Sequence, residues 1–329
     1  MDKRPVSIIM PAKITSEQHL KWLGQALDSA LLQDHVADIV VVNDHSSVSW
    51  KSLTDLFSEE RLRGYAAKNG GGVAYARNLA AEKATGSLLL PLDADDKLPK
   101  NAVTRFLEAW TGDGGSKSGI VYSDVMMFGN GTRRSYVAPK YDFDTLLHAT
   151  YMTIGCLHRK SDWVRAGGWN PQLDIGFEDW EYWIHLGELG VCGHHVNETL
   201  YEYRRHSEGR TAKLRADETG WNTAYATMRS LHTDTFNGRL PMGCCGGSRS
   251  KASRLPASAS AEVMDVASAT LRNPTTLVYI GRRTGAFGMR GLVGIRYRVP
   301  GKGKDFRVDG RDVAYFKKYG GGSVFKQVL

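Results

Sequence analysis

The sequence predicts an α/β fold, with a doubly wound and mostly parallel sheet followed by a small β-rich C-terminal module. Apolar runs that suit buried strands alternate with helical stretches over the first half of the chain. Polar and acidic residues follow directly after these runs, and ligands of open α/β sheets bind at that end of the strands. Near the C-terminus, short apolar runs are separated by glycine turns, which is typical of a small sheet or barrel.

The first predicted strand covers residues 6–10, an apolar run that lies close to the N-terminus with no signal peptide before it. An amphipathic stretch, residues 20–33, predicts the first helix. The second strand is predicted at residues 39–42, and it ends in the polar residues Asn43 and Asp44. A strand, a helix and a second strand form the repeating unit of a parallel sheet.

The same alternation continues along the chain. Residues 62–66 predict a third strand, and a glycine-rich loop then leads into a helix that ends at Gly86. The next buried strand is predicted over the apolar residues 88–92. Pro99 is expected to open the helix that follows.

Three carboxylates, those of Asp93, Asp95 and Asp96, follow this last strand directly. Crowded acids repel one another, so such a cluster is costly unless a cation or hydrogen-bond donors offset it. One interpretation is therefore a metal and nucleotide site. The other is an acidic turn that caps the helix near Pro99, and such turns are common. The motif alone does not decide between the two.

Residues 118–143 predict two alternating strands joined by a glycine turn at residues 129–131. Further on, residues 176–187 place Glu178 and Asp179 before an aromatic-rich helix. Adjacent carboxylates beside aromatic rings are expected to raise at least one pKa through desolvation and repulsion, which suits a general base. The alternative is that the two acids only cap the helix and favour its dipole.

Five motifs occur in the order seen in family 2 glycosyltransferases of the GT-A fold, and residues 5–210 resemble that family. The motifs are VSIIMPAK, VVVNDHSS, NGGGVAYARNLA, LLLPLDADD and GFEDWEYWIHLG. Each is weak by itself, but five in register are fairly specific. The resemblance implies a GT-A (Rossmann-like) domain at residues 1–240. It also implies a glycosyltransferase that moves a sugar from a nucleotide-diphosphate sugar, with UDP-sugars favoured, to an acceptor hydroxyl.

The resemblance implies a donor site made of several loops. Asp44 stands where the family has an aspartate that hydrogen-bonds the nucleotide base, and Pro11 lies beside the same pocket. Asn69 and Arg77 match the loop that lies along the nucleotide and its diphosphate. The glycine turn that ends in Gly168 and Trp169 resembles the wall of the sugar pocket.

The resemblance also implies an inverting, metal-dependent mechanism. Asp95 and Asp96 match the metal-site pair, and Asp93 is an extra leading acid; Asp93 and Asp95 are also expected near the nucleotide sugar. His206 falls where some relatives have a third metal ligand, and a solvated loop histidine is the alternative. The cation would be Mn²⁺ or Mg²⁺, because a hard ion held by carboxylates neutralises the charge of the leaving nucleoside diphosphate.

In the family, the aspartate of the ED pair is the general base that takes the proton of the acceptor hydroxyl. Asp179 is therefore the predicted base, with Glu178 as its catalytic neighbour. The chain departs from the family pattern in two places. His185 lies where members commonly carry an arginine, and we expect it to be structural. The segment after Pro11 lacks the Tyr or Asn that touches the base in many relatives, so uridine is favoured by analogy alone.

The basic charge of the chain lies in its C-terminal part. Residues 241–329 contain 16 Lys and Arg against 5 Asp and Glu, a net charge of +11, whereas the remaining residues contain 27 against 30, a net charge of −3. Residues 241–262 have the Gly, Ser and Ala composition of a linker. Residues 263–329 are predicted to form a small basic β-rich module. This module resembles small modules of tailed bacteriophage proteins, which implies a phage-encoded chain.

Two roles are open for this module. It would bind nucleic acid by neutralising phosphates, and so deliver the enzyme to phage DNA with hydroxylated bases. Alternatively it docks the enzyme on a virion or a protein acceptor; a merely solvated basic surface is the remaining interpretation. The acceptor is accordingly DNA, a protein or a glycan.

No run of 18 apolar residues occurs in the sequence. This argues against a membrane-spanning polysaccharide synthase. The phage resemblance implies a protein of the host bacterial cytoplasm. The alternative function is a non-catalytic nucleic-acid- or virion-binding protein on a decayed glycosyltransferase fold. The presence of Asp44, Asp95, Asp96 and Asp179 favours the active enzyme.

Overall fold

The computed structural model describes residues 5–47, 59–67, 71–112 and 114–238, together with the backbone of five strands further along the chain. The chain divides into two compact units, Met1–Cys244 and Cys245–Leu329. Two of the sequence-based predictions, the donor-site residue Asn69 and the linker at residues 241–262, lie outside the described residues.

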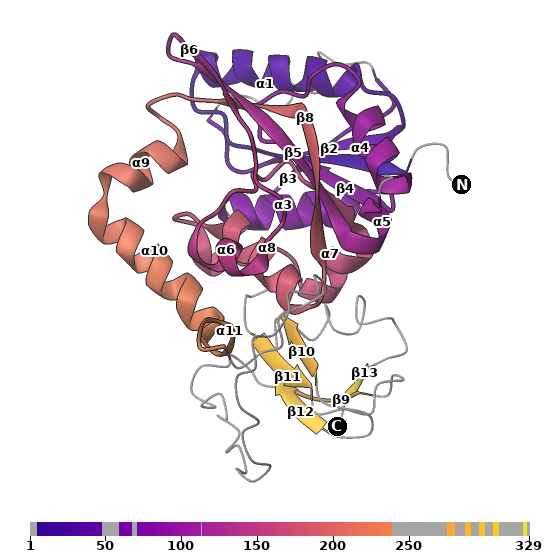
Figure 1. The fold of residues 1–329 in the computed structure, drawn as a ribbon, viewed down its shortest axis with the longest axis vertical. Coiled ribbons are helices and arrows are strands. Elements are labelled where there is room, and N and C mark those ends of the chain that lie inside the picture. The colour runs from indigo at the N-terminus through magenta and orange to yellow at the C-terminus, as the bar shows by residue number, and fades with distance from the viewer. Residues whose placement is uncertain are drawn as a thin grey trace. The chain divides into compact units, whose positions relative to one another are not determined.

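The first unit is built on an eight-stranded sheet in the order β3-β2-β1-β4-β7-β5-β6, with β8 paired to β5 (Figure 1). Its parallel half consists of β1 (Val6–Ala12), β2 (Val36–Asn43), β3 (Leu62–Ala66) and β4 (Leu88–Pro91). Every residue of β1 and β4 is buried, as expected of strands that are covered on both faces. The predicted parallel α/β sheet is therefore confirmed.

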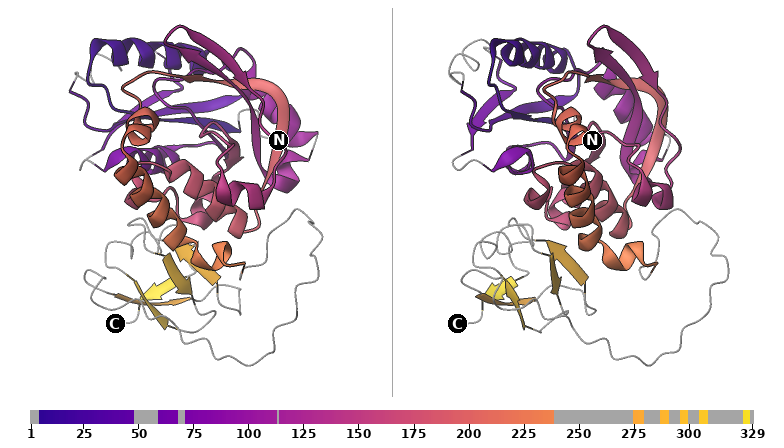
Figure 2. Two further views of the ribbon diagram at one scale, coloured as in Figure 1. Left: turned by 60° about the vertical axis from the view of Figure 1, so that its left-hand side comes forward. Right: turned by 90° about the vertical axis from the view of Figure 1, so that its left-hand side faces the viewer.

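Helices cover both faces of this parallel half. α1 (Glu17–Leu31) lies on one side of the sheet and α3 (Gly72–Lys83) on the other, as the further views in Figure 2 also show. α3 packs on β1 and β2. α1 begins after Ser16, whose side chain accepts a hydrogen bond from the N–H of His19 and so caps the helix.

α4 (Ala102–Thr111) follows the acid cluster. The sequence predicted that Pro99 opens this helix, but the helix begins at Ala102, after its N-cap Asn101. Its start is bound to the segment that follows α1. The side chain of Gln33 donates a hydrogen bond to the Pro99 carbonyl at 3.0 Å and accepts one from the N–H of Val103 at 3.1 Å. These two bonds hold the chain where it passes from the acidic turn into α4.

The other half of the sheet is mixed and consists of β5 (Gly119–Gly129), β6 (Thr132–Tyr136), β7 (Leu157–Arg159) and β8 (Cys192–Arg204). β5 and β6 form the predicted hairpin, with Gly129 opposite Thr132. The two turn residues, Asn130 and Gly131, have φ angles of 48° and 71°. Positive φ at both positions is what the tight turn of such a hairpin requires. β8 pairs with β5 in parallel over most of its length.

The remaining helices of the first unit are α5 (Gly115–Ser118), α6 (Phe143–His148), α7 (Lys160–Ala166), a 3₁₀ turn (Pro171–Leu173), α8 (Glu178–Glu188), α9 (Arg210–Ala216), α10 (Glu218–Leu231) and α11 (Thr233–Phe236). α8 packs against α6 and α7. Its residues Tyr182 and Trp183 are fully buried, and both rings contact the ring of His158 on β7. This aromatic packing fixes the helix that carries the two predicted catalytic acids.

The second unit contains short antiparallel strands. β9 (Thr275–Tyr279) pairs with β12 (Asp305–Val308) and β13 (Phe325–Gln327), and β10 (Phe287–Arg290) pairs with β11 (Arg296–Val299). These strands fall within the stretch for which the sequence predicted a β-rich module. Among the described residues of the whole chain, the helices are too short or too polar to cross a bilayer.

Candidate active site

The carboxyl ends of the parallel strands meet at one edge of the sheet, and predicted site residues lie at the ends of three of these strands. Pro11 lies near the end of β1, opposite Val42 of β2. Asp44 directly follows β2; it is 6% exposed, and its N–H donates a hydrogen bond to the Ala12 carbonyl at 2.8 Å. Asp93 follows β4, which pairs with β1 on the other side. The sheet register therefore brings the base-binding candidates and the acid cluster to the same edge.

The three acids after β4 form one cluster, since an oxygen from each of Asp93, Asp95 and Asp96 lies within 4.8 Å of the other two. Asp96 is the most buried, at 1% exposed. Its two oxygens accept the O–H of Tyr201 at 2.8 Å and the N–H of Arg204 at 2.7 Å. Both donors come from β8, so the long parallel pairing of β8 with β5 supports the cluster.

Burial and repulsion from the neighbouring acids both disfavour the charged forms of Asp93 and Asp96. Burial, and then the charges of Asp95 and Asp93, raise the pKa of Asp96 well above its usual range. Burial also raises the pKa of Asp93, where Arg77 lowers it and Asp95 raises it further. A divalent cation would offset this repulsion, and carboxylate oxygens are the ligands that Mn²⁺ and Mg²⁺ prefer. The residues of the cluster therefore fit such a cation.

His206, the candidate third metal ligand, lies against this cluster. Its Nε2 atom is 2.8 Å from Asp95 Oδ2. Its ring packs on Trp22 of α1, with 4.4 Å between the ring centroids, and its side chain is 12% exposed. A mostly buried ring beside a carboxylate does not match a solvated loop histidine. The geometry favours the interpretation in which His206 and Asp95 act together.

Neither acid motif supplies the cap of the helix that follows it. The N-cap residues of α4 and α8 are Asn101 and Phe177. Glu178 and Asp179 do lie in the first turn of α8, where negative charge favours the helix dipole. Their placement therefore has a stabilising component, but capping does not explain either acid motif.

Arg77 joins the acid cluster to the acids of α8. Its guanidinium donates one hydrogen bond to Asp93 Oδ1 at 2.8 Å and another to Glu178 Oε1 at 3.1 Å. The side chain is 1% exposed, and it lies over the ring of Trp169 at 5.6 Å from the centroid. Arg77 is thus a buried bridge between two motifs, and its contact with a diphosphate stays a prediction.

Glu178 and Asp179 are adjacent but differ in their partners. Arg210, the first residue of α9, donates hydrogen bonds to both carboxylate oxygens of Glu178, at 3.2 and 2.5 Å. Burial opposes the charge of Glu178, but Arg210 and Arg77 lower its pKa to about 2. Asp179 accepts a hydrogen bond from the N–H of Trp180 at 2.7 Å. Burial and the charge of Glu178 raise the pKa of Asp179 to about 6.

Two neighbouring acids whose pKa values are pushed apart can take different roles in one reaction. Glu178 stays charged at every pH at which a typical enzyme works. Asp179 is ionised near neutral pH and yet basic enough to accept a proton. This difference suits Asp179 to the role of general base and Glu178 to that of an anchor for the two arginines.

The glycine turn before α8 is fastened to α3 beside Arg77. The side chain of Asn78 accepts hydrogen bonds from the Trp169 N–H at 2.9 Å and from the Trp163 indole N–H at 3.0 Å, and it donates one to the Trp169 carbonyl at 2.8 Å. Gly168 has a φ angle of +80°, and a Cβ atom here would lie 2.3 Å from the Asn78 oxygen. Only glycine fits this position. Trp169 is completely buried and supports Arg77, while its predicted role at the sugar pocket stays a prediction.

Sequence reasoning missed two residues of this site. Tyr201 donates its O–H to Asp96, and its oxygen accepts the N–H of Asp93 at 3.3 Å. Arg210 binds Glu178 from a helix that the sequence did not predict. Arg210 follows the predicted site residue His206 closely in a basic segment of the chain. This was the available signal, because a basic residue near one part of a predicted site is a candidate partner for its acids.

The α/β sheet, with an acid cluster at its carboxyl edge and an acid-bearing helix bound to that cluster, defines a glycosyltransferase of the GT-A type. Residues 7–162 match the family model described as "Glycosyl transferase family 2". This part of the chain is similar to family 2 glycosyltransferases, and the protein is a glycosyltransferase. The non-catalytic alternative is accordingly not supported.

Relatives of known sequence agree with this assignment. The chain is 26% identical over 232 residues to the putative teichuronic acid biosynthesis glycosyltransferase TuaG of Bacillus subtilis (strain 168), a match that covers 69% of this chain and 89% of TuaG. An uncharacterized glycosyltransferase of Rickettsia bellii is 32% identical over 92 residues, which is 28% of this chain and 13% of that protein.

Solved structures share the fold. TarS 1–349 of S. aureus aligns with a TM-score of 0.50 and 16% identity, over 70% of this chain and 73% of that chain. The mannosyltransferase PcManGT of Pyrobaculum calidifontis, determined with GDP-Man and Mn²⁺, aligns with a TM-score of 0.51 and 17% identity, over 72% of this chain and 65% of that chain. The predicted GT-A fold is therefore confirmed.

Proposed function

We propose that this glycosyltransferase moves a sugar from a nucleotide-diphosphate sugar to an acceptor hydroxyl, with inversion and with the help of a divalent cation. The observation that carries the proposal is the bridge made by Arg77. One guanidinium binds Asp93 of the acid cluster and Glu178, the neighbour of Asp179. The predicted donor site and the predicted base are thereby held together through one buried arginine.

The proposed donor is supported by two structural neighbours. TarS 1–349 was determined in complex with UDP-GlcNAc, and PcManGT in complex with GDP-Man and Mn²⁺. Both proteins share the fold of this chain. In the proposed complex, Asp44 and Pro11 contact the nucleotide base at the ends of β1 and β2, and Asn69 and Arg77 lie along the diphosphate. A uridine nucleotide remains our preferred donor.

The proposed cation, Mn²⁺ or Mg²⁺, would be held by Asp95, Asp96 and His206. When bound, it would neutralise the charge that develops on the leaving diphosphate. Asp95 and His206 are the better placed ligands, because both oxygens of Asp96 already accept hydrogen bonds from β8. Asp96 then contributes mainly its negative charge.

In the proposed reaction, Asp179 takes the proton of the acceptor hydroxyl. The acceptor oxygen forms a bond to the anomeric carbon on the face opposite the nucleotide, and the bond from that carbon to the diphosphate oxygen breaks. The leaving nucleoside diphosphate keeps the electron pair. Because no covalent enzyme intermediate is required, positioning and charge stabilisation supply most of the rate.

The acceptor we propose is a hydroxyl of a bacterial surface polysaccharide. This choice rests on TuaG, whose name refers to teichuronic acid biosynthesis and most of whose length is matched by this chain. A DNA acceptor, a virion or protein acceptor, a phage origin and a cytoplasmic location rest on composition and resemblance, and they stay predictions. The basic residues 263–329 remain the candidate nucleic-acid or virion contact.

The proposal is tested with a panel of UDP-, GDP-, dTDP- and CDP-sugars, each with Mn²⁺, with Mg²⁺ and with a chelator. We expect one nucleotide class to be hydrolysed slowly without acceptor, only when a divalent ion is present, and to raise the melting temperature of the protein. Addition of teichuronic acid fragments or of hydroxylated DNA then distinguishes the acceptors. Equal turnover with chelator would rule out metal dependence, and silence across the panel would overturn the proposed donor class.

The rate of transfer is expected to fall as the pH is lowered through about 6. Asp179 accepts a proton only when it is ionised, and its pKa is raised from 3.8 to about 6, so the base is lost as the pH falls through the higher value. The measurement is kcat against pH at saturating donor. Glu178, with a pKa of about 2, keeps its arginine pairs over this range, so circular dichroism should show an intact fold. A flat profile below pH 6 would contradict the assignment.

A further inference from the structure

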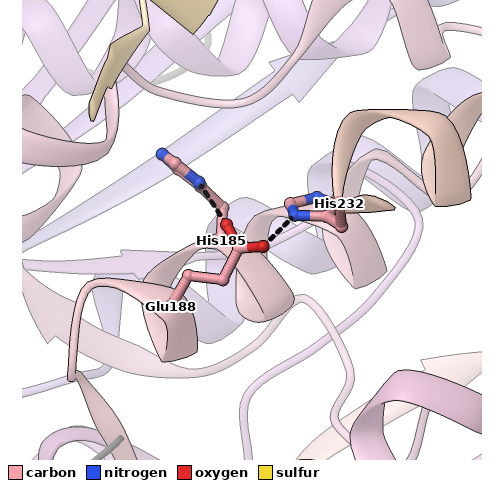
Figure 3. A group of neighbouring side chains, drawn as sticks. All are labelled: His185, Glu188 and His232. Atoms are coloured by element: carbon pink, nitrogen blue, oxygen red, sulfur yellow. Dashed lines mark hydrogen bonds and ion pairs between the residues drawn. The ribbon is translucent and has the colours of Figure 1, made fainter. Parts of the chain in front are cut away.

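A second group of metal-ligating side chains lies at the other end of α8 from the predicted base (Figure 3). His185 and Glu188 belong to the last turn of α8, and His232 lies between α10 and α11. One ligand atom of each lies within 4.8 Å of the other two. At the rise of an α-helix, the group is about 10–15 Å along α8 from Asp179.

Both histidines point the same ring nitrogen at one carboxylate, as the dashed lines in Figure 3 show. His185 Nδ1 is 3.2 Å from Glu188 Oε2, and His232 Nδ1 is 2.7 Å from Glu188 Oε1. The hydroxyl of Thr235 donates a hydrogen bond to the same Oε1 atom and so fixes the carboxylate further. Two imidazole nitrogens and two carboxylate oxygens therefore converge from separate parts of the chain.

The group is shut off from solvent. The side chains of His185 and Glu188 are 4% and 5% exposed, and those of His232 and Glu181 are 0% exposed. Buried charged groups of this kind are stable only when they are paired with one another or coordinate a metal. Two carboxylates and two imidazoles so close together suit either solution.

We propose that His185, Glu188 and His232 bind one Zn²⁺ ion. Imidazole nitrogen together with carboxylate oxygen is a ligand set that Zn²⁺ accepts and that Mg²⁺ does not favour. Zinc bonds to nitrogen and oxygen of about 2.0–2.2 Å, at tetrahedral angles, separate neighbouring ligand atoms by about 3.3 Å. The observed separations of 3.2 and 2.7 Å need only a small expansion to admit the ion.

Glu181 provides the second part of the site. Its Oε1 atom is 2.9 Å from Nε2 of His232, the ring nitrogen that faces away from Glu188. Histidines that bind metal commonly donate their other N–H to a carboxylate, which orients the ring and makes it a better ligand. The same order occurs here: the Glu181 carboxylate contacts one nitrogen of the His232 ring, and the other nitrogen faces the proposed ion position beside Glu188.

The proton balance of the site is simple. A carboxylate only accepts hydrogen bonds, so the two Nδ1 atoms that face Glu188 both carry protons in the metal-free protein. Zinc binding releases the Nδ1 proton of His232 to solvent and leaves that ring with the Nε2 proton that it donates to Glu181. The single proton of neutral His185 moves from Nδ1 to Nε2, so that its Nδ1 lone pair faces the ion. One Zn²⁺, two neutral imidazoles and the carboxylates of Glu181 and Glu188 then have no net charge, which suits a fully buried site.

Such an ion would connect the end of α8 to the corner between α10 and α11. α8 carries Glu178 and Asp179 at its start, so the ion would help to fix the helix of the predicted base from its far end. The site thus differs from the acid cluster in its ligands, in its location and in its role. Its proposal does not depend on the donor or the acceptor of the enzyme.

The first test uses the full-length protein, loaded with zinc and then dialysed against Mg²⁺ in excess so that the acid cluster is occupied. We expect one equivalent of zinc per chain by elemental analysis, and X-ray absorption should show two imidazoles and oxygen around the ion. No retained zinc would overturn the proposal and leave a hydrogen-bonded ion network. Sulfur in the ligand shell would place the zinc at cysteines and overturn it equally.

The second test compares variants by zinc affinity and by the melting temperature with and without zinc. Glu188→Gln and His185→Asn should weaken zinc binding by more than about 100-fold and abolish the thermal shift, whereas Glu181→Gln should weaken it by about 10–100-fold. His194→Asn, on β8, and Asp95→Asn, in the acid cluster, are controls that should keep the zinc. Unchanged affinity in Glu188→Gln would contradict the site; if that variant does not fold, the absorption spectrum of the wild type still decides.

Discussion

Replacement of Asp179 by asparagine is expected to lower the rate of transfer by about 10²–10⁴-fold while the nucleotide still binds. Asparagine has the shape of aspartate but cannot accept the proton of the acceptor hydroxyl. Its side-chain oxygen can still accept the hydrogen bond that the Trp180 N–H now gives to Asp179. The local fold should therefore survive, so that kcat falls far more than the nucleotide affinity. Steady-state kinetics and calorimetric titration of the nucleotide measure the two quantities.

Asp144→Asn provides the control for this prediction. Asp144 is an exposed residue in the first turn of α6 and takes no part in the candidate site. Its replacement removes one carboxylate, as the Asp179 replacement does, and should leave transfer unchanged. Transfer by Asp179→Asn within about tenfold of the wild-type rate would show that another group removes the proton.

The parallel half of the sheet could be predicted from the sequence because its signals are local. Buried strands such as residues 88–92 are short apolar runs, and the helices between them have their own periodicity and end signals. The acids at the strand ends could also be identified, since a cluster of like charges after an apolar run needs a compensating group wherever it occurs. Five motifs in a familiar order then gave these acids their predicted roles.

The supporting half of the site could not be predicted in the same way. Asp96 is held by Tyr201 and by the backbone of Arg204, which are 105 and 108 residues away along the chain. Both residues belong to β8, which is placed beside the acid cluster by its pairing with β5, and no local pattern encodes that pairing. The partner of Glu178, Arg210, likewise comes from a short helix with no strong periodic signal. Long-range pairing decides which donor meets which acid, and this information is absent from single segments.

Replacement of Arg77 by alanine is expected to lower the free energy of unfolding by about 3 kcal/mol and to abolish transfer. Removal of one partner of a buried ion pair typically costs about 3–5 kcal/mol, because the remaining charge stays buried without compensation. Glu178 keeps Arg210, which places the loss at the lower end of this range, while Asp93 loses its arginine. Urea unfolding followed by circular dichroism measures the change.

Arg133→Ala is the matched control, because Arg133 pairs with Glu202 at 3.3 Å on the surface and is 64% exposed. A surface pair of this kind contributes about 0–1 kcal/mol, so this variant should unfold almost as the wild type does. A loss in Arg77→Ala no larger than that of the control would mean that the bridge contributes nothing measurable to stability.

Arg77→Lys separates the charge of Arg77 from its shape. Lysine keeps the positive charge, but its single ammonium cannot reproduce the fork of N–H groups that binds Asp93 and Glu178 from two sides. We therefore expect Arg77→Lys to recover part of the stability that alanine loses and little of the transfer. If transfer depends on the bridge to hold Asp179 beside the donor, activity must follow the geometry rather than the charge. Full activity in the lysine variant would show that a positive charge alone is sufficient there.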